Sequence, residues 1–315
     1  MTTLHLLDLP NLEARLLLAT GAPVWLHVNP VEYHGPHLSL HNDGLISRGL
    51  AERLHARLWP ELPHVTLPDL EVGADPVQGP GTRTVPYPTV RALVLEAVAA
   101  LHALGAQRVV LMTFHGAPLH NLAIHAGLEW LWTRGVKAVA PFHGLLQQLV
   151  DPQAEMLDAA VAAVPVERRL EARALLATDY HAGMFETSLA LALAPDSVSP
   201  AYRDLPPCAS FEPDALMLRA AEVARRLGRG HLATELHFGA WGTGWLNLRP
   251  FPGYSGRPAW ASAEIGEAFA QLLVGQYAAL TEGVFEGLVA HPPPVFAWLA
   301  KVSAGGRLLP KPRGH

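Results

Sequence analysis

Short apolar runs of strand length alternate along this chain with longer stretches of helical period, and this alternation restricts the fold strongly. Gln107–Phe114 (QRVVLMTF) is apolar over most of its length, as expected of a central strand that is buried on both faces. Leu119–Thr133 follows with helical spacing, and Val136–Ala140 is another short apolar run. This strand–helix–strand order predicts a mostly parallel sheet covered by helices, an α/β sandwich.

The same criteria predict further elements on both sides of this unit. Additional strands are expected over Ala22–Val31 and His64–Val72. Helices are expected over Asp43–Leu58, Val90–Leu104, Val166–Ala177, Glu186–Leu193, Pro213–Leu227, Ala261–Thr281 and Val284–Leu299. The Gly- and Pro-rich stretches Gly73–Pro88 and Phe238–Trp260 are expected to be irregular. We expect residues 1–301 to form a single domain and residues 302–315 a flexible tail.

The composition excludes several classes of protein. Half of the 315 residues are hydrophobic and 16% are charged, which is typical of a globular enzyme. A formal net charge of −5 without a basic stripe argues against a nucleic-acid partner. Because Asp8, Glu13 and Arg15 interrupt the apolar start, neither a secretory signal nor a membrane span is expected. The single cysteine, Cys208, rules out an intrachain disulfide and a thiolate metal site, so a cytoplasmic location is predicted.

The chain contains 17 histidines, and the first group with a suggestive pattern follows the expected strand Ala22–Val31. Glu32 and His34 are two residues apart, so on an extended strand both side chains would lie on the same face. Asp43 begins the next helix, where it could cap the helix or turn its carboxylate toward Glu32 and His34. The carboxyl ends of strands are where α/β sheets usually bind ligands.

Two more groups occur at comparable positions. His115 directly follows the apolar run that ends at Phe114, and His181 and Glu186 lie five residues apart at an expected loop-to-helix transition. Taken singly, each residue has an ordinary structural explanation, such as a buried core histidine. Together they form an oxygen and nitrogen ligand set that suits Zn, Mn, Fe or Co. Such a set can hold two ions and generate a hydroxide nucleophile.

Other residues carry weaker signals. His37, three residues after His34, is expected either to orient a ligand carboxylate or to have a simple loop role. His120 and His125 are read as surface or packing residues, and His143 as a pocket-lining residue. An aromatic pocket wall is one interpretation of Trp241, Trp245 and Tyr254, although core packing is the better explanation for at least two of them.

These segments resemble the creatininase (creatinine amidohydrolase) family. EYHGPHLSLHND resembles the family's E-x-H-G-x-H-L-P-L stretch ending in Asp, and DYHAGMFETS resembles its D-x-H-A-G-x-x-E-T-S motif. RVVLMTFHG resembles the strand that leads into N-G-H-G-G-N. Pro80-Gly81-Thr82 and the glycine-rich element Gly256-x-Pro258…Ala261…Glu264-x-Gly266 resemble two further family features in the same order.

The resemblance implies a three-layer α/β/α fold, a homo-oligomer of up to six subunits and a dinuclear centre of two divalent ions, zinc or manganese, with iron as an alternative. It implies that Glu32 and His115 bind one ion, that His34 and Glu186 bind the other, and that Asp43 bridges them. His181 would then transfer a proton from the bridging hydroxide or water to the leaving nitrogen.

This sequence departs from the family pattern at two places. Ser39 replaces a proline, and Thr113–Pro118 replaces N-G-H-G-G-N, with Ala117 where creatininases carry a ligand glutamate. The ligand role passes to Glu186, as in other branches of the family, and creatinine itself becomes less certain as substrate. We therefore expect hydrolysis of a C–N bond in a cyclic amide or formamide. The alternatives are an inactive metal-binding scaffold and a peptide-trimming maturation enzyme.

Overall fold

Five strands form one parallel sheet in the part of the chain that this computed structural model describes, residues 2–151, 158, 161–176 and 178–303. The strands are β1 (Thr3–His5), β2 (Val24–His27), β3 (His64–Thr66), β4 (Arg108–Met112) and β5 (Lys137–Val139). Their order in the sheet is β1-β3-β2-β4-β5. The chain leaves β2 toward β3 and later returns to β4 on the other side of β2, so the strand order reverses between β2 and β4.

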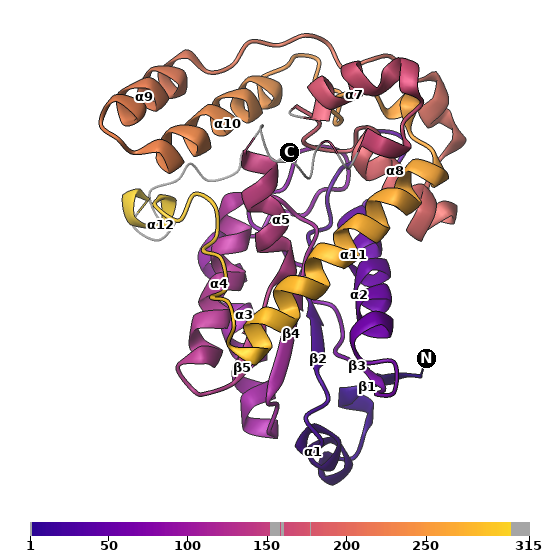
Figure 1. Cartoon of the computed structure of the whole chain (residues 1–315), viewed down its shortest axis with the longest axis vertical. Coiled ribbons are helices and arrows are strands. Elements are labelled where there is room, and N and C mark those ends of the chain that lie inside the picture. Colours follow the sequence, from indigo (N-terminus) through magenta and orange to yellow (C-terminus); the bar gives the residue numbers. More distant parts are fainter. Residues whose placement is uncertain (1, 152–157, 159–160, 177, 304–315) are drawn as a thin grey trace.

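Helices cover both faces of the sheet, which confirms the predicted α/β sandwich (Figure 1). The longer helices are α1 (Asn11–Ala19), α2 (Asn42–Leu58), α3 (Tyr87–Leu104), α4 (Pro118–Trp132), α5 (Pro141–Val150), α7 (Arg169–Leu176), α8 (Met184–Leu193), α9 (Ala215–Arg226), α10 (Gly230–Leu246) and α11 (Ala263–Glu286). A one-turn helix, α12 (Leu299–Val302), follows them. Short 3₁₀ turns span Leu6–Asp8, Val161–Ala163, Val166–Arg168, Pro195–Ser197, Pro200–Asp204 and Pro258–Trp260.

Alternating side chains of the strands fill two separate cores. Val24, Leu26 and Leu111 pack with α1, α3 and α4 on one face. Trp25 and Met112 pack on the other face with α2, α5, α8 and α11. The central strands β2 and β4 are therefore buried on both sides, which is why they are nearly continuous apolar runs rather than alternating ones.

Helix ends follow from local sequence. Pro88 occupies the first turn of α3, where a backbone N–H has no helical partner, and Gly105 ends that helix with a positive φ of 107°. Ser262 caps α11 because its side chain accepts a hydrogen bond from the N–H of Ile265. Gly287 ends α11 in the left-handed conformation, with φ 74°.

The expectation of an irregular Phe238–Trp260 was wrong for its first part, because α10 continues to Leu246 and packs beside α9 (Figure 1), whereas residues 247–257 are irregular as expected. Two glycines of α10, Gly239 and Gly244, allow close packing. A Cβ at Gly244 would lie 2.1 Å from the carbonyl oxygen of Glu212, so only glycine allows this approach of backbone to backbone. A glycine-rich sequence was read as a loop, although Gly239 and Gly244 allow close contacts with Met217 of α9 and with the backbone of Glu212.

The expected helix Val284–Leu299 was also wrong. Helix α11 continues through Thr281 to Glu286, and the chain is then non-helical until α12. Gly287 stops the helix, and the run Pro292–Pro294 supplies no backbone N–H to start another. Elements β1, α1 and α5 were not predicted. Most of the expected tail, residues 304–315, lies outside the described residues.

Among the described residues, one helix, α3, is long and apolar enough to cross a membrane by length and composition. This is weak evidence, since core helices of soluble proteins meet the same criterion. The buried side chains of α3, among them Val90, Val94 and Val98, belong to the core shared with the sheet and α4.

Candidate metal centre

The predicted ligands meet beyond the carboxyl ends of β2 and β4. The chain segment after β2 carries Glu32 and His34, and the segment after β4 carries His115. Asp43 lies in the first turn of α2 and Glu186 in the first turn of α8, and all five side chains are buried. Since the strand order reverses between β2 and β4, this is the crevice in which open α/β sheets bind ligands.

Glu32 and His34 were expected to face the same side because they lie two apart on a strand. This explanation was wrong, because β2 ends at His27 and both residues lie in a loop. Backbone contacts fix that loop. The N–H of Glu32 donates to the Leu40 carbonyl at 2.9 Å, and the N–H of Tyr33 donates to Thr82 Oγ1 at 2.9 Å. Both side chains nevertheless face the same site.

Asp43 lies between two pairs of residues. His115 Nδ1 is 2.9 Å from Glu32 Oε2 and 3.5 Å from Asp43 Oδ2. His34 Nε2 is 3.1 Å from Asp43 Oδ1 and 3.8 Å from Glu186 Oε2. Of the two possibilities for Asp43, the structure shows the carboxylate turned toward the histidines, while His41 occupies the N-cap position of α2.

Both histidines are held by the ring nitrogen that faces away from the carboxylates. Nδ1 of His34 donates to the backbone carbonyl of Glu32 at 3.0 Å, and Nε2 of His115 donates to that of Ala74 at 3.1 Å. A carbonyl accepts only, so the opposite nitrogen of each neutral ring has a free lone pair. Metal-binding histidines are typically oriented in this way.

The carboxylates are only partly satisfied by the protein. Glu32 Oε1 accepts from the N–H of Val77, and Glu186 Oε2 accepts from the N–H of Ala182 at 2.6 Å. Glu32 Oε2 and Asp43 Oδ2 are buried and make no hydrogen bond. Buried carboxylate oxygens of this kind need a positive partner.

Three carboxyl groups in one buried site strongly shift each other's ionisation and that of the histidines. Burial opposes the charged form of His34, but Asp43, Glu186 and Glu32 together raise its pKa to about 10. Burial likewise opposes charge on His115, and Glu32 with Asp43 raises its pKa to about 9. Burial raises the pKa of Glu186 to about 8, partly offset by His34. A site that holds protons this firmly is a favourable place for cations.

The donor set fits two divalent ions. Glu32, Asp43 and His115 form one group whose ligand atoms lie within 4.8 Å of one another, and His34, Asp43 and Glu186 form a second. Asp43 belongs to both groups. A third combination, Glu32, His34 and His181, meets the same distance criterion. Imidazoles and carboxylates without thiolates suit zinc, manganese or iron.

His181 lies against this site. Its ring stacks on that of His34, and Nε2 donates to the backbone carbonyl of Tyr33 at 2.8 Å. Burial, together with the neighbouring His34, lowers the pKa of His181 well below its ordinary value. The ring is therefore neutral at neutral pH, and Nδ1 is the nitrogen left to accept a proton.

The turn between His181 and α8 has an unusual backbone. Ala182 has a positive φ of 50°, and its N–H reaches back to the Glu186 carboxylate. Gly183 follows, and a Cβ there would lie 1.7 Å from Asp179 Oδ1. Asp179 Oδ2 accepts from the N–H of Phe185 at 3.2 Å, which anchors the first turn of α8 and hence Glu186.

His37 contacts a neighbour of a predicted ligand. Its Nε2 is 2.9 Å from Thr187 Oγ1, and its ring packs edge-on against Tyr254. Among the described residues, no carboxylate of the set is a hydrogen-bond partner of His37. Its contact is with the helix that carries Glu186.

Several residues that position His115 were missed by sequence reasoning. Asn29 Oδ1 accepts from the N–H of Phe114 at 3.0 Å, and Asn121 Nδ2 donates to the His115 carbonyl at 2.8 Å. Thr113 Oγ1 accepts from the N–H of His115 and contacts His120 Nε2, each at 3.1 Å. Isolated Asn and Thr residues give no motif, so only their spatial convergence identifies them.

The altered segment after β4 keeps His115 in the site. Ala117 is the N-cap residue of α4, and Pro118 is that helix's first residue, where proline is well tolerated. The restriction that Pro118 puts on the backbone therefore falls at a helix start.

A cavity of about 740 Å³ opens onto the centre. Glu32, His115, His181 and Glu186 lie at its polar end. Aromatic side chains form much of the remaining wall: Phe114, Phe142, Phe185, Phe238, Trp245 and Phe251.

One of the three aromatic residues considered for a pocket wall, Trp245, lines this cavity. Trp241 packs on Phe211 and Tyr254 donates to the Pro206 carbonyl, so packing accounts for two of the three, as expected. The assignment of His143 to a pocket lining needs correction. His143 does not line the cavity, because its ring is buried between helices.

Comparison with known proteins supports this picture. A family model described as creatinine amidohydrolase (creatininase) matches residues 6–281. The chain belongs to the creatininase family. Members of this family are metal-dependent amidohydrolases. A comparison with curated protein sequences found no significant match.

Solved structures of creatininases share the fold. A crystal structure of creatinine amidohydrolase (creatininase) aligns with a TM-score of 0.59 at 20% identity, covering 93% of this chain and 100% of the other. A manganese creatininase aligns with a TM-score of 0.57 at 21% identity and the same coverage. A creatininase variant of Zn–Zn type aligns with a TM-score of 0.58 at 20% identity, again with 93% and 100% coverage.

Proposed function

We propose that this creatininase-family protein is a hydrolase that cleaves a C–N bond in a small amide at a dinuclear metal centre. In this proposal Glu32 and His115 bind one ion, His34 and Glu186 bind the other, and Asp43 bridges them. The observation that carries the proposal is the position of Asp43 between the two histidines. Its Oδ1 faces His34 and its Oδ2 faces His115.

The chain's own groups have distinct tasks in such a reaction. When bound, two divalent ions would polarise the scissile carbonyl and lower the pKa of a bound water toward neutrality. His181 keeps its Nε2 proton on the Tyr33 carbonyl, so Nδ1 is the atom that takes up a proton and returns it to the leaving nitrogen. The aromatic cavity wall excludes water and orients the substrate.

The cavity favours a particular class of substrate. A volume of about 740 Å³ exceeds what a bare creatinine-sized ring needs, and most of the wall is apolar. We therefore propose cyclic amides or formamides that carry an apolar group. A cytoplasmic location and a homo-oligomer remain predictions, and light scattering on the purified protein measures the latter.

The ligand set is tested by metal content per chain in the wild type and in Asp43→Asn. The expected result is about two ions in the wild type and at most one in the variant. Asp75→Asn is the matched control, because Asp75 lines the cavity near His115 but lies outside the ligand groups, and its positive φ of 53° is tolerated by Asn. Equal metal content in the wild type and Asp43→Asn would contradict the assignment.

The activity is tested by incubating the metal-loaded protein with creatinine, larger cyclic amides and N-formyl amines, and measuring the released amine. Hydrolysis that Glu186→Gln abolishes and Glu267→Gln preserves supports the proposal, since Glu267 pairs with Arg53 on the surface. A protein that binds two ions but hydrolyses no amide of the panel would be a metal-binding scaffold.

A further inference from the structure

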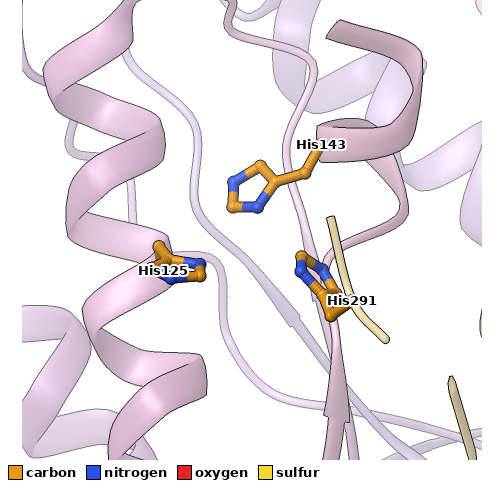
Figure 2. Close-up of side chains that lie close together, drawn as sticks. All are labelled: His125, His143 and His291. Atoms are coloured by element: carbon orange, nitrogen blue, oxygen red, sulfur yellow. The ribbon is translucent and has the colours of Figure 1, made fainter. Parts of the chain in front are cut away.

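A second group of histidines lies apart from the centre described above. His125 on α4, His143 at the start of α5 and His291 after α11 come from three segments that are distant in the sequence, and their rings face a common space (Figure 2). One ring nitrogen of each lies within 4.8 Å of one from each of the others. None of the three residues lines the cavity.

His143 is the most deeply placed of the three. Its side chain is fully buried, and within the described part of the chain neither ring nitrogen has a hydrogen bond of regular geometry, although the backbone carbonyl of Asn121 is close enough to favour the protonated ring. A buried imidazole that is so poorly satisfied is unusual, because buried polar atoms are almost always hydrogen-bonded. The ring is directed at the two other histidines, with centroids 5.3 Å from His291 and 6.0 Å from His125.

The two other histidines each have one nitrogen in contact with an outer group. Nε2 of His291 accepts from the Ala140 N–H at 3.1 Å, or, in the tautomer protonated at Nε2, donates to the Ala140 carbonyl at 3.3 Å. Nε2 of His125 lies 3.6 Å from Glu129 Oε1 on the same helix. In both rings Nδ1 is buried and makes no hydrogen bond.

In metal sites generally, a second group outside the site holds each histidine ring in position, and the contacts of His125 and His291 resemble this arrangement. A carbonyl or carboxylate on one ring nitrogen fixes the tautomer, and the other nitrogen presents its lone pair to an ion. The carbonyl of Ala140 can do this for His291 in the tautomer protonated at Nε2, and the carboxylate of Glu129, 3.6 Å from Nε2 of His125, favours the corresponding tautomer of that ring. Burial lowers the pKa of all three histidines, which keeps them in the neutral form that binds metals.

We propose that His125, His143 and His291 bind one divalent transition-metal ion of the zinc class at a site separate from the catalytic centre. Three imidazoles and no carboxylate in direct contact suit zinc, cobalt, nickel or copper, and do not suit calcium or magnesium. Zinc in a four-coordinate site would retain one position for water.

Such an ion would join the segment after α11 to the sandwich. His291 precedes Pro292–Pro294, a run that has no backbone N–H to form a sheet or helix. Farther along, that segment is held by the burial of Val295 and Phe296, and near the prolines Gln147 Nε2 donates to the Pro293 carbonyl at 2.8 Å. A shared ion would tie it directly to α4 and α5.

The test is zinc content per chain after chelation, reloading with zinc and gel filtration, compared between the wild type and His291→Gln. The expected result is a loss of one zinc ion in the variant. His125→Gln should lose the same ion, and His237→Gln, which alters an exposed histidine on α10, should lose none. The difference between chains is the readout, so the result does not depend on how many ions the catalytic centre binds.

Both cluster variants alter a partly exposed residue, and circular dichroism checks that they fold. Anomalous scattering at the zinc edge from crystals of the unmodified, zinc-loaded chain is a second measurement that needs no variant. A peak among the three imidazoles is expected. Equal zinc in the wild type and a folded His291→Gln, or no anomalous peak at this position, would overturn the proposal.

Discussion

The imidazole rings of His34 and His181 stack with their centroids 4.1 Å apart and an angle of 26° between their planes. His34 faces Asp43 and Glu186, whereas His181 lines the cavity. The stack therefore places a neutral, proton-accepting ring directly against a predicted metal ligand. It also explains why positive charge on His34 helps to lower the pKa of His181.

Replacement of His181 separates proton transfer from metal binding. In His181→Asn we expect kcat to fall by roughly 10²–10⁴-fold, the usual contribution of a general acid or base, with metal content unchanged. The measurement is steady-state kinetics on an amide that the wild type hydrolyses, together with metal content per chain. Loss of an ion from this variant would instead identify His181 as a ligand, in the combination with Glu32 and His34.

His64 makes the stability of the fold depend on pH. Burial, with a smaller effect of His55, lowers the pKa of His64 from 6.5 to about 4. Between these values the unfolded chain binds more protons than the folded one, so the free energy of unfolding falls as the pH falls from 6.5 toward 4. From pH 7.5 to pH 5 this residue alone should remove about 2 kcal/mol.

Urea unfolding at pH 7.5 and pH 5 checks this prediction. In His64→Leu the decrease between the two pH values should be about 2 kcal/mol smaller than in the wild type. His237→Gln, at an exposed position, should retain the wild-type pH dependence. An unchanged decrease in His64→Leu would show that protonation of other groups destabilises the fold at acid pH.

The contact between α10 and the segment that leads into α9 should depend on Gly244. Because a Cβ at this position would lie 2.1 Å from the Glu212 carbonyl oxygen, Gly244→Ala should lower the free energy of unfolding by about 1–3 kcal/mol. Gly242→Ala is the matched control on the same helix, where no atom lies within 4 Å of the added Cβ, and it should be neutral or stabilising by up to about 1 kcal/mol. Urea midpoints that rank the two variants in the opposite order would refute the packing explanation.

The sequence alone determined the fold class and the identity of the residues that meet at the centre. Continuous apolar runs such as Gln107–Phe114 required strands buried on both faces, and the helical periods between them required a parallel sheet. Glu32, His34, Asp43, His115 and Glu186 could be selected because each follows or begins a predicted element, and the carboxyl ends of parallel strands share one edge of the sheet.

Only the tertiary structure decided how these groups contact one another and what supports them. Whether Asp43 capped a helix or faced the histidines depended on the path of the loop after β2, which no local pattern specifies. The support of His115 by Asn29 and Asn121 joins residues far apart in the chain. The same holds for His125, His143 and His291, which looked unremarkable in the sequence. Such contacts arise from packing between segments, whereas periodicity and turn chemistry report only on neighbours along the chain.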